Sequence, residues 1–373
     1  GENSVYPDKD LAIAWAHTEN CSIYYFVIRD GVKAYNRWRQ QILDTYGTNT
    51  EELYNISALD VLFSIWRVGH LQYDPSWMVL SFIDINASRV LSESEFEDII
   101  SNNTLITEYY GQTHQVSNLS DLLEFFNSTN ENISGIVELR LINSSASILA
   151  ILADSFLSVV PMKYVFDAAG WNYTQALIDI DYGKNMTALA WYINSSQGEE
   201  ELSHKILDRF PIATGPFYIY DYKDSSWIVL RKNPYYWNAT MYLQNLNYGT
   251  INHVLYYYES NISLLLEYYK NGSIDICYVP PENISMINGT TYPNSDYRII
   301  ISYNPDKPGL EITYVVWNHL KYPLNNTLIR QALAYATPYE KISSEVFYNT
   351  TIRLYGPIPK GLLGYTENNI AKY

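Results

Sequence analysis

The residues most able to bind a metal or catalyse a reaction are too widely spaced to form a recognisable site. No two of the six histidines are four residues apart, and metal-binding helices use that spacing; they are His17, His70, His114, His204, His253 and His319. The sequence contains neither Gly-x-Ser-x-Gly nor a phosphate-binding loop. We therefore expect no metal site and no cofactor.

Two further pairs could act as acid, base or nucleophile. Asp179 and Asp181 lie two residues apart, so they share a face only within a strand. Solvated turn carboxylates fit this spacing better than a glycosidase pair, whose members come from distant elements. Cys277 has His253 on a nearby predicted strand, but neither residue has the local sequence of a thiol catalyst. The chain is predicted to bind rather than to catalyse.

The composition favours an acidic globular protein. Of its 373 residues, 47% are hydrophobic and 17% are charged, and the net charge is −16. Such a charge repels phosphate backbones, so we expect no nucleic-acid partner. The 37 tyrosines suit half-exposed sheet faces and binding clefts equally well, because a Tyr ring can be buried while its hydroxyl stays hydrogen-bonded.

Asn-x-Ser/Thr sequons are far more frequent than chance, which gives about 5 for this composition. The eighteen sequons begin at Asn20, Asn55, Asn86, Asn102, Asn118, Asn127, Asn132, Asn143, Asn172, Asn185, Asn194, Asn238, Asn261, Asn271, Asn283, Asn288, Asn325 and Asn349. They predict a heavily N-glycosylated protein at an archaeal cell surface, anchored through a segment outside this chain. An Asn- and Ser-rich composition is the plainer alternative.

Cys21 and Cys277 could pair in an exported protein, although two lone buried thiols fit as well. We expect them not to be bonded to each other. The longest apolar run, 146–160, contains Asp154 and is too short to span a bilayer, so it is predicted to be a core helix.

The first 200 residues show a mixture of strands and helices. Strands are predicted at 22–31 and 135–142, and helices at 57–71 and from Ser92 through Ile100. Polar, sequon-rich loops are expected over 101–135.

The pattern of predicted strands and helices changes near residue 205, which suggests a domain boundary. A hairpin at 217–231 and a strand at 251–259 precede a helix at 261–272, followed by strands at 273–279, 298–303 and 310–318. A helix at 325–348 should be kinked or restarted at Pro338. The predicted fold class is α/β with mixed sheets.

The hairpin "TGPFYIYDYKDSSWIVLRKNPYYW" resembles the signature of the solute-binding proteins of peptide and nickel ABC importers. Further segments are similar to other motifs of this family and occur in the family's order: "YYFVIRDGVKAYNRW", "SALDVLFSIWRV", "YYKNGSIDI", "VVWNHLKYPLNNTLIRQALAYAT" and "YGPIPKGLLGY". Together they run from about 22 to 365. The chain departs from the pattern at Asn36-Arg37, where the family has Asp-Gly, and family members are considerably longer.

The resemblance implies a two-lobed fold of the periplasmic-binding-protein type (type II, with an inserted extra domain). Residues 1–204 would be mostly the inserted domain with part of the first lobe, 205–298 the main lobe, and 299–373 the start of a third domain. Thr214, Gly215 and Pro216 look like the crossing between lobes, where glycine allows a close backbone approach and proline fixes φ.

The same resemblance implies an extracellular receptor that captures a peptide or similar small solute by hinge closure and delivers it to an ABC permease. The residues expected to line its cleft are Cys277, Tyr278, Val279, Tyr314, Trp317 and Asn318, with Tyr73 and Trp77 as a lid. A structural or adhesive glycoprotein on the same fold is the main alternative, and a secreted glycan-acting enzyme is a third.

Overall fold

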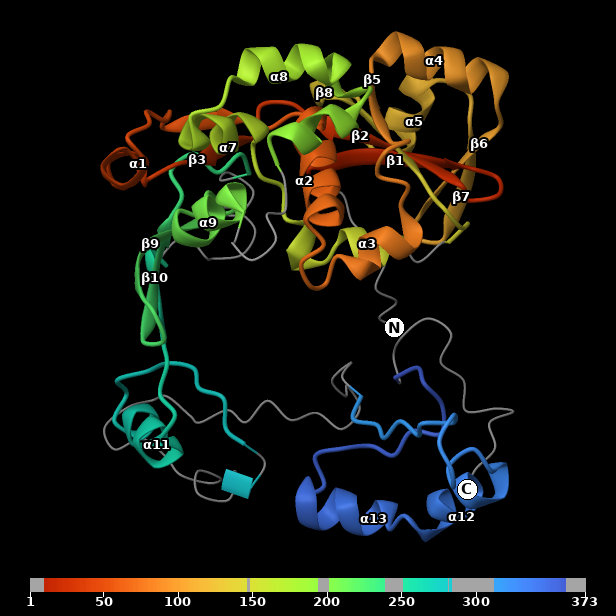
Figure 1. The fold of residues 1–373 in the computed structure, drawn as a ribbon, viewed down its shortest axis with the longest axis vertical. Helices are drawn as coiled ribbons and strands as arrows, with labels where there is room; N and C mark the ends of the chain where they lie inside the picture. The colour runs from red at the N-terminus through yellow and green to blue at the C-terminus, as the bar shows by residue number, and fades with distance from the viewer. Residues whose placement is uncertain are drawn as a thin grey trace. The chain divides into compact units, whose positions relative to one another are not determined.

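A computed structural model describes residues 10–145, 148–193, 201–238, 251–280, 282–283 and 312–359. The chain forms two compact units that divide between Tyr257 and Tyr258, and each is described separately (Figure 1). Helices and strands occur together in a mixed α/β fold.

The first unit is built on a six-stranded antiparallel sheet with the order β5-β8-β2-β1-β6-β7. Its strands are β1 (Ala12–Thr18), β2 (Ile23–Arg29), β5 (Arg89–Leu91), β6 (Leu105–Tyr109), β7 (Gln112–Val116) and β8 (Ile133–Arg140). The predicted strands at 22–31 and 135–142 correspond to β2 and β8.

Both faces of the sheet are covered at its centre. Tyr25 of β2 contacts Phe96 of α4 (Glu93–Asn102), with 5.3 Å between ring centroids. Trp15, which pairs with the next residue of β2 and so lies on the other face, contacts Phe126 just after α5 (Leu119–Phe125) at 4.5 Å. The run Tyr24–Ile28 of β2 is therefore apolar and buried on both sides rather than alternating.

Helix α2 (Ala58–Leu71) begins where the sequence predicts it. Ser57 and Asp60 form a complete capping box, in which each side chain bonds the backbone N–H of the other residue. Its buried residues include Leu62, Phe63 and Trp66, and the helix packs against β8.

Smaller elements complete the first unit. They are β3 (Lys33–Tyr35), α1 (Arg39–Tyr46), β4 (Leu53–Asn55), α3 (Trp77–Phe82), α6 (Ile148–Leu152), η1 (Ser155–Leu157), α7 (Met162–Ala169), α8 (Tyr173–Asp179), η2 (Asp181–Gly183), η3 (Met186–Trp191) and α9 (Leu202–Arg209). A second antiparallel sheet, in the order β11-β10-β9, follows with β9 (Phe217–Lys223), β10 (Trp227–Lys232) and β11 (His253–Tyr257).

The described part of the second unit contains α11 (Ile262–Lys270), α12 (Thr327–Ala336), α13 (Tyr339–Lys341) and a π-helical turn, η6 (Ile342–Val346). The helix predicted at 261–272 corresponds to α11. The helix predicted at 325–348 stops at Ala336 and restarts after Pro338, as the proline requires.

Several predicted elements are wrong. Residues 101–135 are not loops but contain β6, β7 and α5. The run at 146–160 is divided after α6, because Asp154 caps the separate turn η1. No strand forms at 273–279 or over the described residues 312–318. All strand pairs among the described residues are antiparallel, so the parallel pairing expected for mixed sheets is not found there. The strand predicted at 298–303 lies outside the described residues.

Candidate functional site

Asn233 joins the two ends of the signature hairpin. Its side-chain amide donates to the carbonyl of Gly215 at 2.8 Å, and its backbone N–H donates to the carbonyl of Pro216 at 2.8 Å. Its side-chain oxygen accepts from the N–H of Tyr235 at 3.0 Å. Only 2% of Asn233 is exposed. The Thr-Gly-Pro start and the Asn-Pro end of the motif therefore form one hydrogen-bonded unit.

No neighbour of Gly215 within the described ranges would exclude a side chain. A Cβ added there would lie 4.0 Å from the carbonyl oxygen of Phe217, and the residue does not have a positive φ. The expected close backbone approach at Gly215 is thus wrong. Ala213, just before the proposed crossing, forms a β-bridge with Tyr35. The Tyr35 N–H donates to the Ala213 carbonyl at 2.9 Å.

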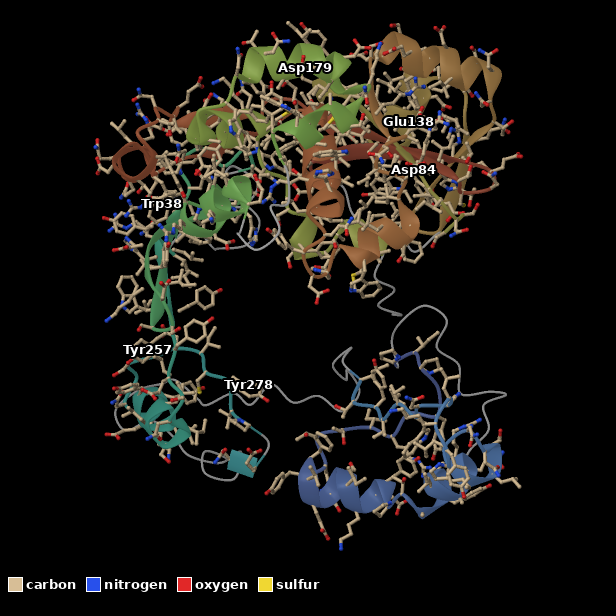
Figure 2. All side chains as sticks on the ribbon, viewed as in Figure 1. Trp38, Asp84, Glu138, Asp179, Tyr257 and Tyr278 are labelled. Atoms are coloured by element: carbon tan, nitrogen blue, oxygen red, sulfur yellow. The ribbon has the colours of Figure 1, made fainter. Side chains whose placement is uncertain are left out.

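The base of the hairpin is attached to the body of the first unit by aromatic and cationic side chains. The Arg37 guanidinium lies 4.5 Å from the ring centroid of Tyr220 and also donates to the Tyr220 carbonyl. Within the hairpin itself, Arg231 of β10 stacks on the same ring, 3.2 Å from the centroid of Tyr220 in β9. Trp38, which is labelled in Figure 2, donates its indole N–H to the carbonyl of Pro211 at 2.8 Å. The Asn36-Arg37 departure from the family pattern therefore has a structural role here.

The residues predicted to form the lid belong to the first unit. The Tyr73 hydroxyl accepts from the N–H of Glu201 at 3.3 Å, and its ring packs 4.6 Å from that of His204. Tyr73 is thus held in place by its own unit. Trp77, at the start of α3, is 57% exposed and available for contact.

The residues predicted to line the cleft belong to the second unit. Tyr278 is 77% exposed (Figure 2) and Tyr314 is 74% exposed. Cys277, Val279 and Trp317 are half-buried, and Asn318 is exposed. Within the described ranges, no hydrogen bond, ion pair or ring contact joins Tyr278 to Tyr314.

The structure offers no support for a catalytic or metal centre among the described residues. They contain no group of three or more His, Cys, Asp or Glu side chains placed to hold a metal ion. Asp179 accepts from Gln175 at 2.8 Å and from the Tyr192 hydroxyl at 3.2 Å, as a surface carboxylate does. Burial raises the pKa of the Cys277 thiol, which disfavours the thiolate that a nucleophile needs.

Sequence reasoning missed two buried charged groups. Glu138 of β8 is fully buried and pairs with Arg89 at 3.2 Å and Arg140 at 2.7 Å. Burial next to Glu138 raises the pKa of Tyr25 to about 12. The only sequence signal was a glutamate within an otherwise apolar strand.

The second buried group joins α2 to α9. Arg67 donates to the Ser203 hydroxyl at 3.0 Å, and Ser203 donates to the carboxylate of Glu201. Burial lowers the pKa of Arg67, while the negative charge of Glu201 opposes that change. Charges buried in this way hold α9 to the body of the unit.

Comparison with known proteins identifies the family. The sequence model described as "Bacterial extracellular solute-binding proteins, family 5 Middle" matches residues 152–373, more than half of the chain. The chain belongs to this family. It is the binding-protein class of peptide and nickel ABC transport, as the motifs predicted, and its members bind rather than catalyse.

Two curated relatives from Escherichia coli are similar at low identity. The probable ABC transporter periplasmic-binding protein SapA is 25% identical over 182 residues, covering 47% of this chain and 29% of the relative. The dipeptide-binding protein is 26% identical over 162 residues, covering 43% of this chain and 27% of the relative.

Two solved structures share the fold. The Helicobacter pylori periplasmic binding protein DppA, in complex with the peptide STSA, has a TM-score of 0.55 at 17% identity; the match covers 99% of this chain and 57% of that one. HbpA2 from Haemophilus parasuis has a TM-score of 0.51 at 18% identity, with 98% of this chain and 57% of that chain covered. The present chain thus covers a little over half the length of each of these two proteins.

Proposed function

We propose that this family member is the extracellular receptor of an ABC importer and binds a peptide or a similar small solute. The family match over 152–373 carries the proposal. The backbone similarity to a DppA structure that contains a peptide supports a fold suited to such a ligand. No helix among the described residues is long and apolar enough to cross a membrane. The permease would be a separate membrane partner.

In this proposal the solute lies between two lobes that close around it. Rigid aromatic rings with hydroxyl tips and half-exposed strand-like backbone suit an adaptable solute site better than fixed charges do. The large exposed fractions of Tyr278 and Tyr314 are consistent with that role. Of the two lid candidates, Trp77 is the better one, because Tyr73 is held by Glu201 and His204. The domain limits near 204 and 298 and the crossing at 214–216 remain part of the proposal.

We also propose an N-glycosylated surface. Sixteen of the sequon asparagines are among the described residues; fourteen are exposed, and Asn238 and Asn283 are half-buried. At Asn118, Asn172 and Asn261 the side-chain oxygen caps a helix, which leaves the nitrogen that carries a glycan for attachment. Asn194 and Asn288 lie outside the described residues. The sequon density is the sole support for an archaeal cell surface.

A structural or adhesive role on the same fold is favoured by this exposure, since a glycan at most of these sites would cover much of the surface. Light scattering on protein from its native source separates the two functions. A monomer that carries a solute supports the receptor, and an ordered polymer without solute supports the structural protein.

The receptor is tested on the full-length protein. Native mass spectrometry should first show a copurified solute, and calorimetry with the peptide STSA and a dipeptide mixture should then give the affinity. We expect the double variant Tyr278→Ala/Tyr314→Ala to weaken binding at least about tenfold, because two aromatic faces are lost. Tyr110→Ala, an exposed tyrosine of the first unit, is the control. Unchanged affinity in the double variant would remove these residues from the site.

A further inference from the structure

Trp191, the last residue of η3, has a largely solvent-exposed indole ring. It is 85% exposed, more than any other large apolar side chain described in the first unit. The ring is nevertheless held in position, because it meets Tyr192 edge-on at 5.1 Å with an interplanar angle of 89°. Tyr192 in turn packs against the buried Phe166 at 5.1 Å. The result is a rigidly based aromatic surface that faces solvent.

The end of α8 supports the same surface. The Tyr192 hydroxyl donates to Asp179 at 3.2 Å, and Asp179 lies at the surface of the unit (Figure 2). This bond fixes the orientation of Tyr192 and hence the edge against which Trp191 rests. An exposed tryptophan with a fixed neighbour loses little conformational freedom when a ligand stacks on it.

The register of η3 places a sequon on the same row as Trp191. A 3-10 helix has three residues per turn, so side chains three positions apart lie above one another. Met186 and Leu189 form the fully buried row. Ala188 and Trp191 form the next row, and Asn185, whose φ of −140° and ψ of 81° are not helical, lies at its N-terminal end. A rise of about 2 Å per residue separates the two ends of this row by about 12 Å.

Asn185 is exposed and has a geometry compatible with glycan attachment. The hydroxyl of Thr187, the second required residue of the sequon, donates to the side-chain oxygen of Asn185. This bond uses the oxygen and leaves the amide nitrogen for the sugar. The backbone N–H of Asn185 donates to the Ile180 carbonyl at 2.9 Å, which fixes the start of the row.

We propose that the first sugars of an N-glycan on Asn185 lie along η3, over Ala188, and stack on Trp191. The inference rests on the proposed glycosylation. The indole ring offers a large apolar area and a negative π face, which suit the C–H-bearing face of a sugar ring. Ala188 leaves room for the glycan, because a larger side chain in the middle of the row would block it.

Asn20 provides a matched control. It is an exposed sequon asparagine of the same unit, and its side-chain oxygen likewise accepts from the hydroxyl of its sequon serine, Ser22, at 2.8 Å. It lies in the turn between β1 and β2, which contains no tryptophan. A glycan there should leave Trp191 unaffected.

The test is hydroxyl-radical footprinting with peptide mass spectrometry on the full chain made in an N-glycosylating host. We expect Asn185→Gln to raise the oxidation rate of Trp191 several-fold, and Asn20→Gln to leave it unchanged. Oxidation of Trp77 serves as the internal reference. In thermal unfolding, Trp191→Ala should lower the melting temperature by about 2–4 °C more in the glycosylated protein than in the Asn185→Gln background, where only its contact with Tyr192 is lost.

The glycopeptide map separates the possible failures. An unmodified Asn185 in a protein with other occupied sequons overturns this inference alone. A protein without any glycan overturns the proposed glycosylation as well and leaves the receptor function standing. Equal oxidation of Trp191 in the wild type and in Asn185→Gln also overturns the inference, including the case where another protein chain covers the indole.

Discussion

At the scale of single residues, Asn233 shows why the hairpin signature begins and ends as it does. The residue is buried, and it satisfies two carbonyl oxygens and one N–H at the points where β9 begins and β10 ends. Pattern recognition identified the motif but could not assign this contact, because the partners are eighteen residues apart. The motif is a structural clamp at the base of the hairpin.

Asn233→Ala should destabilise the first unit by about 1–3 kcal/mol, because it leaves the Gly215 carbonyl and the Tyr235 N–H without these partners. Urea unfolding measures the change. Asn252→Ala is the control: Asn252 is exposed, and its backbone carbonyl, not its side chain, accepts from Lys232. An equal loss in both variants would contradict the assigned role of the Asn233 side chain.

Replacement by alanine should have little effect on stability at Gly215 and a large destabilising effect at Gly183. At Gly215 an added Cβ meets nothing closer than 4.0 Å, so Gly215→Ala should change stability by less than about 1 kcal/mol. At Gly183 the added Cβ would lie 2.8 Å from a Val90 methyl, and φ is +98°, so Gly183→Ala should cost about 2 kcal/mol or more. Thermal unfolding of both variants compares them, and a larger loss at Gly215 would contradict this.

At the scale of elements, the first turn of α4 combines a cap with a long-range ion pair. The Glu95 carboxylate accepts from the Ser92 N–H and hydroxyl, each at 2.8 Å, and pairs with Lys184 at 3.0 Å. The bond from the Ser92 backbone, followed by that from Lys184, lowers the pKa of Glu95 to about 2. The sequence predicted the cap, since Ser92 and Glu95 are three apart, but not the partner from η2–η3.

Because the folded pKa of Glu95 lies below its ordinary value of 4.5, the fold favours the ionised carboxylate. Its contribution is fully present above pH 4.5 and is lost as the pH falls towards 2. Glu95→Ala should therefore lower the melting temperature at pH 7 and have a much smaller effect near pH 2. At pH 7 the free energy of unfolding should fall by at most about 1 kcal/mol, because the Glu95 side chain is partly exposed.

Glu93→Ala is the matched control for that pH profile, since Glu93 lies in the same first turn without the capping-box bonds. Its effect should be small and should not follow the same pH window. A pH-independent effect of Glu95→Ala would show that the carboxylate charge is not what stabilises the helix start.

The elements that the sequence predicted have local signals. The capping box at Ser57, the glycine after α11 and the break at Pro338 all lie within a few residues of the ends they determine. β6 and β7 were missed because they lie in a polar, sequon-rich stretch, although the buried Leu105 and Thr107 of β6 alternate with half-buried and exposed residues. The strand predicted at 273–279 had strand-like residues, but a strand also needs a pairing partner, and composition does not supply one.

At the scale of the whole molecule, the two units differ in how much apolar surface they bury. Every fully buried hydrophobic residue among the described ranges lies between Ile13 and Phe210, with the exception of Leu266 in α11. In α12 no residue is buried, and Leu328 and Tyr335 are 72% and 68% exposed. The sequence could not predict this contrast, because both parts have similar helical patterns and both are rich in tyrosine.

This contrast predicts the distribution of amide hydrogen exchange in the 373-residue chain. Amides in α2 should exchange only on global unfolding of the first unit, because the helix is buried against the sheet. Amides in α12 make the same kind of helical hydrogen bond but open locally, because no packed apolar face holds the helix. Since a global free energy of unfolding of about 5 kcal/mol corresponds to a factor of more than a thousand, protection in α2 should exceed that in α12 by about a thousandfold.

Mass spectrometry of peptic fragments measures both helices in one sample, so each is the control for the other. Equal protection would mean that a surface not seen among the described residues packs on α12, and the solute site around Tyr314 would then have to be placed against that surface.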